Sequence, residues 1–328
     1  MRVHVLHHGR CFDGAASAAL FAAFMRARHG LGTNDPGLDL RYVPKHHRHG
    51  DPFEDADFAG ADEAAVVDFR YTQRPGLTWY FDHHRSAFQL DGDRSHFEAD
   101  RSGRKFHDPA APSCTGYLAR MVSAHFGVDL SAHAELIRWG EIIDSAAFPS
   151  PEVAVLYQQP AMQLAAWIQI AEDPAAIAAF IEALLTTPLD TLATADWIRA
   201  LVTPRLEEHR RDIALIRERG RIDGQVFVYD LLDDGPRVLS HFIPYYLAPK
   251  VTYTVGIYAH PDGDLRLSVG FNPWLEGALR RHDLAALCEA HGGGGHPYVA
   301  GASFAAEQGD TLRRAQAQIV ATLRGDSP

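Results

Sequence analysis

The chain has 328 residues, of which 46% are hydrophobic, so it is long enough for two domains that each bury a core. Its formal net charge is −11 and its pI is near 5.9, which argues against a dedicated binder of long nucleic acid, because such proteins cluster Lys and Arg to neutralise phosphates. The sequence has no uncharged apolar run long enough for a membrane span, and its three cysteines are widely spaced and odd in number, so we expect a cytoplasmic protein without a disulfide framework.

The first 90 residues alternate between strand-like and helix-like segments. A polar turn at 8–14 leads into an Ala-rich helix predicted at 15–28. Short runs of β-branched, aliphatic or aromatic residues predict strands at 3–7, 38–43, 64–69 and 77–81. Strands and helices in alternation favour an α/β domain with a parallel sheet.

Two polar segments of this half are expected at the surface. A short basic run stands at Lys45-His46-His47-Arg48-His49, and we interpret it as a solvated loop. Residues 91–112 carry charges of both signs and predict a surface loop or a short hairpin.

The middle of the chain is predicted to be helical. Helices are expected at 116–126 and 132–143, followed by further Ala- and Leu-rich helices to about residue 201. The strongly charged segment 204–219 has the polarity of a helix that bridges two domains. We therefore expect a first domain, a linker helix and a smaller second domain at 1–200, 201–220 and 221–328.

The second domain is predicted to mix strands and helices. A helix at 284–290 leads into the glycine-rich run from His291 to Tyr298, and a strand and a terminal helix close the chain. Before that helix, strands are expected at 226–232, 251–258 and 265–269.

Acidic and imidazole side chains stand where the predicted strands of the first domain end. They are His7 and Asp13 around the first turn, Asp68, Asp82-His83-His84, and Asp144 at the end of a helix. Because the carboxyl ends of parallel strands form the ligand-binding edge of an α/β sheet, we expect these groups to converge. Taken singly, Asp13 could be a helix cap, Asp68 a turn residue and His7 a packing residue, but their joint placement favours a site.

The donors in this set suit divalent metal ions. Carboxylate oxygens and imidazole nitrogens favour Mn²⁺, with Mg²⁺, Fe or Zn²⁺ as alternatives. Two such ions about 3.5–4 Å apart would share a bridging ligand and would promote attack on phosphorus. The pattern therefore predicts metal-dependent cleavage of a phosphate ester.

As an ordered set, the motifs resemble those of the DHH phosphoesterases that carry a C-terminal DHHA1 domain. The resemblance spans nearly the whole chain and rests on His7 with Asp13-Gly14, Val66-Val67-Asp68, Asp82-His83-His84, Asp144 and Gly292-Gly293-Gly294-Gly295-His296. It implies an α/β fold in which a Rossmann-like DHH domain is joined by a helix to a smaller α/β DHHA1 domain. The family includes RecJ-type exonucleases, nanoRNases, cyclic-dinucleotide phosphodiesterases and, with a different second domain, family II inorganic pyrophosphatases.

The resemblance also implies roles for single residues. One metal ion would be held by Asp13, Asp68, His83 and Asp144, and the other by His7, Cys11 and Asp68. His84 would contact the scissile phosphate, and Asp82 would orient the histidines. Substrate would also be bound by Arg85, Gly293, Gly294, Gly295 and His296, the glycines acting through bare backbone N–H groups. The alternative interpretation of the glycine run is a helix stop.

The sequence departs from the family pattern at two places. Members usually have an aspartate where this chain has Cys11, and a thiolate is a softer ligand that favours Zn²⁺ or Fe over Mn²⁺. We therefore expect the second metal site to be lost, weakened or altered in its preference. Oligonucleotide-cleaving members also commonly have an arginine near residues 271–274, and Arg266, Arg280 and Arg281 are the candidates to replace it.

We therefore expect a metal-dependent phosphoesterase that hydrolyses phosphodiester bonds in short oligonucleotides or dinucleotides, as an exonuclease of either direction or a nanoRNase-like enzyme. Its expected partners are small phosphorylated substrates, with no membrane and no module for long nucleic acid, and a homodimer is a possible assembly. Two alternatives stay open: a hydrolase of polyphosphate or pyrophosphate, and a catalytically impaired nucleotide-binding sensor, since Cys11 alters one motif.

Overall fold

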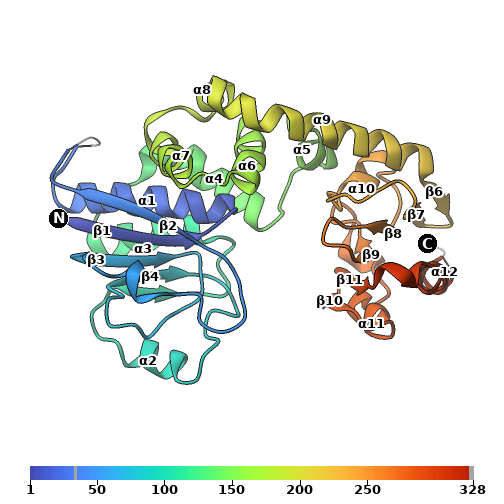
Figure 1. The fold of residues 1–328 in the computed structure, drawn as a ribbon, viewed down its shortest axis with the longest axis horizontal. Coiled ribbons are helices and arrows are strands. Elements are labelled where there is room, and N and C mark those ends of the chain that lie inside the picture. The colour runs from blue at the N-terminus through green and yellow to red at the C-terminus, as the bar shows by residue number, and fades with distance from the viewer. Residues whose placement is uncertain (33–34, 325–328) are drawn as a thin grey trace. The chain divides into compact units, whose positions relative to one another are not determined.

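A computed structural model describes residues 1–32 and 35–324, and the chain divides into two compact units. The first unit comprises Met1–Phe148 and Gln158–Thr203, and the second comprises Pro149–Tyr157 and the chain from Pro204 onward. Each unit contains one β-sheet with helices packed on it (Figure 1).

The sheet of the first unit is entirely parallel, as the sequence predicts. Its strands are β1 (Arg2–His8), β2 (Asp39–Lys45), β3 (Glu63–Val67), β4 (Trp79–Asp82) and β5 (Lys105–His107). They lie in the order β2-β1-β3-β4-β5. The chain therefore builds the sheet outward in both directions from β1, which creates a switch point between β1 and β3. In open α/β sheets, ligands bind outside the carboxyl ends of the strands at such a point.

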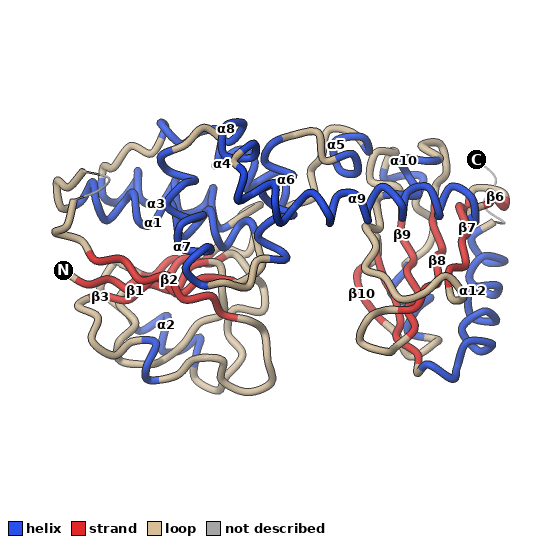
Figure 2. Tube along the Cα trace, turned by 45° about the horizontal axis from the view of Figure 1, so that its top comes forward, coloured by secondary structure: helices blue, strands red, loops and turns tan. Residues whose placement is uncertain are grey.

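Helices cover one face of this sheet (Figure 2). Helix α1 packs on β1 and against α3, α4 and α7. Side chains of β4 alternate between the two faces, because successive residues of a strand point in opposite directions. Trp79 and Phe81 contact Phe21 of α1, whereas Tyr80 belongs to the core on the opposite face. The helices of this unit are α1 (Phe12–Arg28), α2 (Asp93–Ala99), α3 (Cys114–Phe126), α4 (Ala134–Asp144), α6 (Pro160–Ile170), α7 (Pro174–Thr186) and α8 (Leu189–Thr194).

The opposite face is covered by connecting segments and by α2. Its core includes Phe53, Phe69, Tyr71 and Tyr80, with Phe97 of α2 packed against them. Both α2 and β5 lie within residues 91–112, so the expectation of a loop or short hairpin there was wrong. β5 pairs in parallel with β4, and its three residues are too few and too polar to show an alternating hydrophobic pattern.

The second unit contains a six-stranded mixed sheet in the order β10-β11-β9-β8-β7-β6. β7 and β8 are parallel, and the other neighbours are antiparallel. Its strands are β6 (Arg221–Asp223), β7 (Val226–Leu231), β8 (Tyr253–Ala259), β9 (Leu265–Phe271), β10 (Gly294–His296) and β11 (Val299–Phe304). Apolar side chains of α11 (Leu284–Glu289) and α12 (Gly309–Leu323) join those of the strands in one core. The short helices α5 (Pro151–Leu156) and α10 (Ile243–Leu247) pack on each other.

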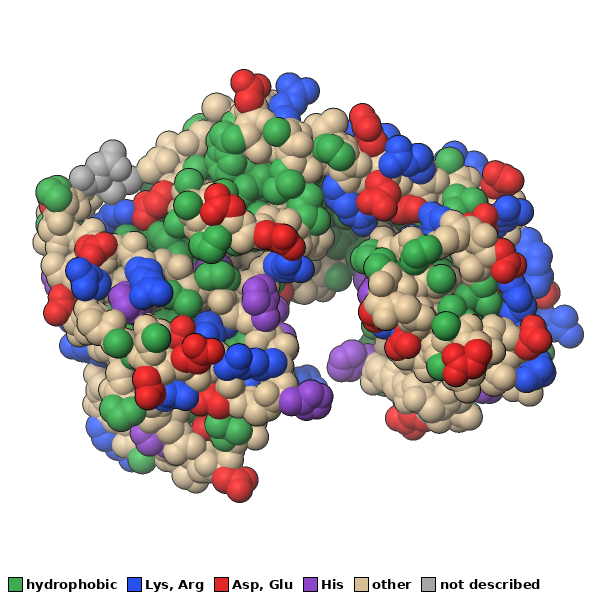
Figure 3. All heavy atoms as spheres, viewed as in Figure 1, with side chains coloured by type: hydrophobic (Ala, Val, Ile, Leu, Met, Phe, Trp, Pro, Cys, Tyr) green, Lys and Arg blue, Asp and Glu red, His purple; other side chains and the backbone are tan. Residues whose placement is uncertain are grey.

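Helix α9 (Asp196–Arg219) runs through the boundary between the units, which falls between Thr203 and Pro204. Charged side chains of both signs are interspersed on the visible surface (Figure 3). Among the described residues, no helix combines the length and the apolar character that crossing a membrane requires.

Candidate metal centre

The strand register aligns three chemically important positions at one edge of the first sheet. His7 of β1 is paired with Val67 of β3, and Val67 is paired with Phe81 of β4. One position further along the chain from these three paired residues are His8, Asp68 and Asp82. They therefore lie together at the carboxyl edge of the sheet. The backbone N–H of Asp68 donates to the Phe81 carbonyl at 2.9 Å. This edge is the one at which the β1/β3 switch point places a ligand.

The turn after β1 brings Cys11 and Asp13 to the same edge. A Cβ atom at Gly14 would lie 2.2 Å from the carbonyl oxygen of His8, so only glycine lets the start of α1 pack this closely on the end of β1. The Asp13 carboxylate accepts the backbone N–H groups of Cys114 at 2.7 Å and Thr115 at 2.9 Å. Asp13 therefore caps the N-terminus of α3, although Asp13 itself belongs to α1. The same carboxylate also faces the site.

Asp144 arrives as the last residue of α4, which packs closely on α3. A Cβ atom at Gly140 would lie 2.9 Å from the side chain of Thr115, and one at Gly116 would lie 2.1 Å from the Glu141 carboxylate. The absence of side chains at these two glycines allows the close crossing, which leaves the Asp144 carboxylate 3.1 Å from His83 Nε2.

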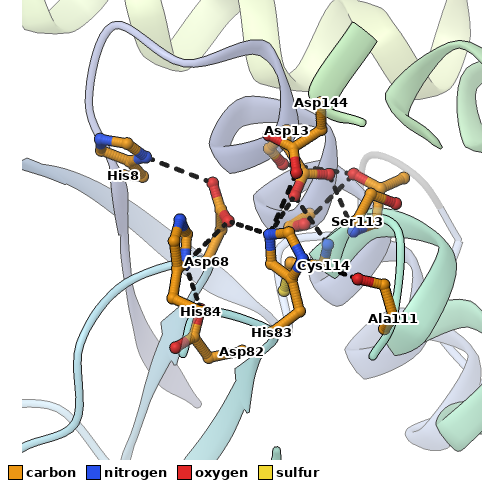
Figure 4. Close-up of polar contacts among 12 residues, drawn as sticks. His8, Asp13, Asp68, Asp82, His83, His84, Ala111, Ser113, Cys114 and Asp144 are labelled. Atoms are coloured by element: carbon orange, nitrogen blue, oxygen red, sulfur yellow. Dashed lines mark hydrogen bonds and ion pairs between the residues drawn. The ribbon is translucent and has the colours of Figure 1, made fainter. Parts of the chain in front are cut away.

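The converging side chains form three overlapping groups whose potential ligand atoms lie within 4.8 Å of one another (Figure 4). The groups are Asp13–His83–Asp144, Asp68–His83–His84 and His8–Cys11–Asp68. His83 Nε2 lies 3.1 to 3.8 Å from oxygens of Asp144, Asp68 and Asp13. Ligands held at 2.0–2.1 Å around an octahedral ion are about 3 Å apart, so the spacing suits an ion between these atoms. Asp68 belongs to two of the groups.

Several buried atoms at this edge have no hydrogen-bond partner among the described residues. They are both carboxylate oxygens of Asp68, Nδ1 of His8, and Nε2 of His7 and His83. Leaving a buried polar atom without a hydrogen bond costs about 1–3 kcal/mol, so five such atoms at one edge suit the binding of a ligand. His83 Nδ1 contacts the Ala111 carbonyl at 3.0 Å, and donation there leaves the lone pair of Nε2 aimed at the carboxylates. The donor set therefore fits a divalent cation.

The pKa values of the site also point to excess negative charge. Burial alone would lower the pKa of His83, but Asp144, Asp68 and Asp13 raise it to about 11. Burial raises the pKa of Asp13 well above its ordinary value, and the charges of Asp68 and Asp144 raise it further. Burial would also raise the pKa of Asp68, but the adjacent His8 and His83 lower it overall. A bound cation would supply the positive charge that these groups otherwise take up as protons.

His8 is the site residue that sequence reasoning missed. Its Nδ1 lies 3.5 Å from Asp68 Oδ2, and its side chain belongs to the group with Cys11. His7, the predicted ligand, is fully buried, and burial lowers its pKa to about 4. Its Nδ1 contacts the His8 carbonyl at 3.0 Å, while its Nε2 is unpaired. The sequence offers no local signal that separates His8 from His7, because the two are adjacent residues of the same type.

Cys11 lies together with His8 and Asp68, at the place where the second metal position is expected. It stands at the N-cap of α1 but makes no side-chain capping bond. Burial raises the pKa of its thiol well above the ordinary value, and the charges of Asp68 and Asp13 add to this effect. Of the other cysteines, Cys114 and Cys288 are buried in the cores of the two units.

Asp82 holds His84 in place. Its Oδ1 lies 2.7 Å from His84 Nδ1, and its Oδ2 accepts the Tyr80 hydroxyl at 3.0 Å. Both carboxylate oxygens are therefore occupied, and Asp82 belongs to none of the three groups. Burial would lower the pKa of His84, but Asp82 raises it overall, with Asp68 contributing. Arg85 follows as an exposed residue.

In the second unit, the first glycines of the glycine-rich run end α11. The N–H groups of Gly292 and Gly293 donate to the Glu289 and Cys288 carbonyls at 3.0 and 2.9 Å, and Gly292 has a φ of 77°. The helix-stop interpretation therefore holds for these two residues. Gly294, Gly295 and the exposed His296 form β10, the edge strand paired with β11.

A hollow of about 410 Å³ lies beside this run. Gly292 and Gly293 line it together with Tyr258, Arg266 and Ser268. Arg266 also pairs with Asp262 and Asp264. Arg280 and Arg281 do not line this hollow, so Arg266 is the best placed of the three arginines that the sequence offers.

No family model and no curated protein matches the chain by sequence. Among solved structures, the chain is similar over its full length to the pGpG-specific phosphodiesterase PggH from Vibrio cholerae, with 17% identity, a TM-score of 0.67 and 100% of both chains covered. It is also similar to the DHH domain of a protein described as a member of a family of ribosomal proteins, with 13% identity, a TM-score of 0.53, and 98% of this chain and 87% of that chain covered. These similarities confirm the predicted fold, an α/β domain with a parallel sheet followed by a second α/β domain.

Proposed function

We propose that this protein is a metal-dependent phosphodiesterase that hydrolyses dinucleotides or short oligonucleotides. The observation that carries the proposal is the set of unpaired carboxylate oxygens and imidazole nitrogens buried at the β1/β3 switch point. The full-length similarity to a protein named a pGpG-specific phosphodiesterase supports a dinucleotide as the first substrate to test.

In this proposal, Asp13, Asp68, His83 and Asp144 would hold one ion, while Cys11 and Asp68 would hold the other with His8 or His7. When bound, two divalent ions would neutralise the phosphate and lower the pKa of a water molecule that attacks it. The protein's own contribution is to fix the ligands. Asp13 is held by two backbone N–H groups, and His83 is oriented by its contact with the Ala111 carbonyl.

His84 is proposed to contact the scissile phosphate. Its contact with Asp82 fixes the ring and leaves Nε2 available as a hydrogen-bond donor or acceptor. A raised pKa favours the imidazolium form, which donates a stronger, charge-assisted bond to a phosphate oxygen. Asp82 would then act by positioning His84, and Arg85 would add a second cationic donor.

The second unit is proposed to carry a substrate-binding surface of its own. Since the N–H groups of Gly292 and Gly293 are already used, the donors would come from the edge strand with Gly294, Gly295 and His296. Gly293 would contribute by its lack of a side chain, because a Cβ atom there would lie 2.2 Å from the Gly301 carbonyl oxygen. Arg266 lines the adjacent hollow, where Asp262 and Asp264 already balance its charge.

Mn²⁺ is the proposed metal, with Mg²⁺, Fe or Zn²⁺ as alternatives, and Cys11 provides a test of this choice. We expect Cys11→Asp to lower the Mn²⁺ concentration for half-maximal turnover about tenfold, because a carboxylate is a harder ligand than a thiolate. Aspartate is also a favourable N-cap residue, so α1 should be preserved. Titration of both proteins with Mn²⁺ measures the effect.

The control for this titration is Cys288→Ala, which removes a buried cysteine of the second unit and should leave the Mn²⁺ requirement unchanged. An unchanged or higher requirement in Cys11→Asp would mean that Cys11 only packs or belongs to a site tuned for another metal.

Substrate length tests the proposed function. We expect kcat/KM to be highest for about two to five nucleotides and to fall for longer strands, because added phosphates bring negative charge toward a chain of net charge −11. A panel from dinucleotide to long single strand, assayed with Mn²⁺, measures this dependence. Equal or better cleavage of long strands would indicate a processive exonuclease instead.

The other outcomes of the same panel separate the alternatives. Cleavage of polyphosphate or pyrophosphate alone would favour that class of hydrolase. Binding of nucleotides without cleavage would favour the sensor. A cytoplasmic location and a homodimer stay predictions, and the free thiols of all three cysteines suit a reducing compartment.

A further inference from the structure

The basic run at 45–49 leaves the sheet beside the candidate metal centre. β2 ends at Lys45, which is paired with His8 in the parallel register of β1 and β2. The backbone N–H of Gly9 donates to the Lys45 carbonyl at 2.8 Å, which extends this pairing by one residue. Because the two strands are parallel, the residues after Lys45 emerge at the same carboxyl edge as the metal ligands.

Two imidazoles of this segment pack directly on the centre. The His47 ring lies 4.9 Å from that of His8 in an edge-on arrangement and 4.8 Å from the ring of Phe69, measured between centroids. The His46 ring covers Gly9, where a Cβ atom would lie 2.4 Å from its Cε1. A side chain at position 9 would displace the His46 ring, so the glycine leaves room for His46 beside the turn that carries Cys11.

The backbone of the segment is held by buried and half-buried arginines. Arg70, which is 6% exposed and two residues after Asp68, donates to the carbonyls of Arg48 and Gly50. Arg74 donates to Asp51 and to the Phe53 carbonyl, both at 2.8 Å. These bonds tie the segment to the chain that follows β3. His46 and His47 are thus presented from a fixed backbone.

Both imidazoles are exposed, and their ring nitrogens make no hydrogen bond with any residue in the described part of the chain. The neighbouring cations are already paired, Lys45 with Asp57 and Arg10 with Glu172. An imidazole always carries at least one N–H donor, whether or not it is protonated. The edge of the centre therefore has two free donors on a rigid support.

We propose that His46 and His47 form a phosphate subsite beside the metal centre, which binds a second phosphate group of the substrate. This inference rests on the proposed function for the identity of the substrate. A dinucleotide with a terminal phosphate carries two phosphate groups, and the metal ligands account for only the scissile one. The proximity of the His47 and His8 rings places the subsite within the reach of a single nucleotide.

The test uses His47→Phe in the full-length protein, because phenylalanine keeps a ring against His8 and Phe69 but removes the N–H donor. We expect KM for pGpG to rise about tenfold, which is a larger change than that in kcat, since the lost hydrogen bond is one to a charged phosphate group. His47→Gln keeps a donor and should recover part of the loss. His49→Ala is the matched control, since His49 is exposed in the same segment and makes no ring contact among the described residues.

A binding measurement tests the subsite independently of catalytic activity. Calorimetry would measure the affinity of the Mn²⁺-loaded protein for inorganic phosphate. The dissociation constant should rise in His47→Phe and stay at the wild-type value in His49→Ala. Equal values in wild type and His47→Phe, or equal losses in His47→Phe and His49→Ala, would overturn the subsite. If the wild type binds phosphate in this pattern but cleaves no phosphodiester, the proposed function fails and the subsite stands.

Discussion

Replacing Asp68 by asparagine is expected to lower kcat for pGpG by about a thousandfold or more. Among the described residues, Asp68 is the one shared by the His8–Cys11–Asp68 and Asp68–His83–His84 groups. Its side chain is fully buried, and neither carboxylate oxygen accepts a hydrogen bond from the described part of the chain. Asparagine keeps the size of the side chain but removes the charge. Both proposed ion positions would therefore lose a ligand at once.

The fold should survive Asp68→Asn. Asp68 has a φ of 55°, in the left-handed region where asparagine and aspartate are the best tolerated residues after glycine. Its backbone N–H, which bonds to the Phe81 carbonyl, is unchanged. The thermal midpoint should therefore stay close to that of the wild type, whereas Asp68→Ala would strain the turn as well.

The measurement is kcat at saturating Mn²⁺, with the metal content of each protein determined in parallel. Asp91→Asn is the matched control, because Asp91 is an exposed aspartate in a turn of the same unit. It should retain wild-type kcat and metal content. Near-normal turnover in Asp68→Asn would show that the assignment of two ions around this carboxylate is wrong.

The elements that carry the centre could be predicted because each has a strong local pattern. β1 and β4 are short apolar runs that end in polar residues, and α1 is an Ala-rich helix after a glycine-containing turn. In a parallel sheet, these ends must meet at one edge, so the convergence of Asp68, His83 and Asp13 followed from topology rather than from contacts.

The contribution of His8 could not be predicted, because it depends on backbone direction at the end of β1. Successive strand residues point to opposite faces, so a shift of one position decides which of His7 and His8 faces Asp68. The Gly9–Lys45 bond and the close packing at Gly14 fix this geometry. Both features join segments that are separate in the sequence.

The dual role of Asp13 and the position of the 45–49 segment were hidden for the same reason. The helix that Asp13 caps begins about one hundred residues later, so the sequence near Asp13 carries no sign of it. The basic run reads as a solvated loop by composition, yet Arg70 and Arg74 hold it against the centre. Local polarity does not reveal such long-range hydrogen bonds.

Removal of metal is the second change for which we expect a very large effect, because all the proposed catalytic ligands act through bound ions. The full-length protein, dialysed against a chelator, should cleave pGpG at less than about one hundredth of the rate with Mn²⁺. Within the described residues, no Lys or Arg side chain pairs with the buried carboxylates at this edge. The described part of the chain therefore has no positive side chain at this edge that could replace the ions.

The most direct test of a metal-dependent phosphodiesterase is therefore the rate of pGpG hydrolysis by one protein preparation, measured after chelation and again after metal is restored. Turnover that disappears on chelation and returns with Mn²⁺ is the predicted result. Turnover that persists in the chelator, or that is absent with each of Mn²⁺, Mg²⁺, Fe²⁺ and Zn²⁺, would contradict it.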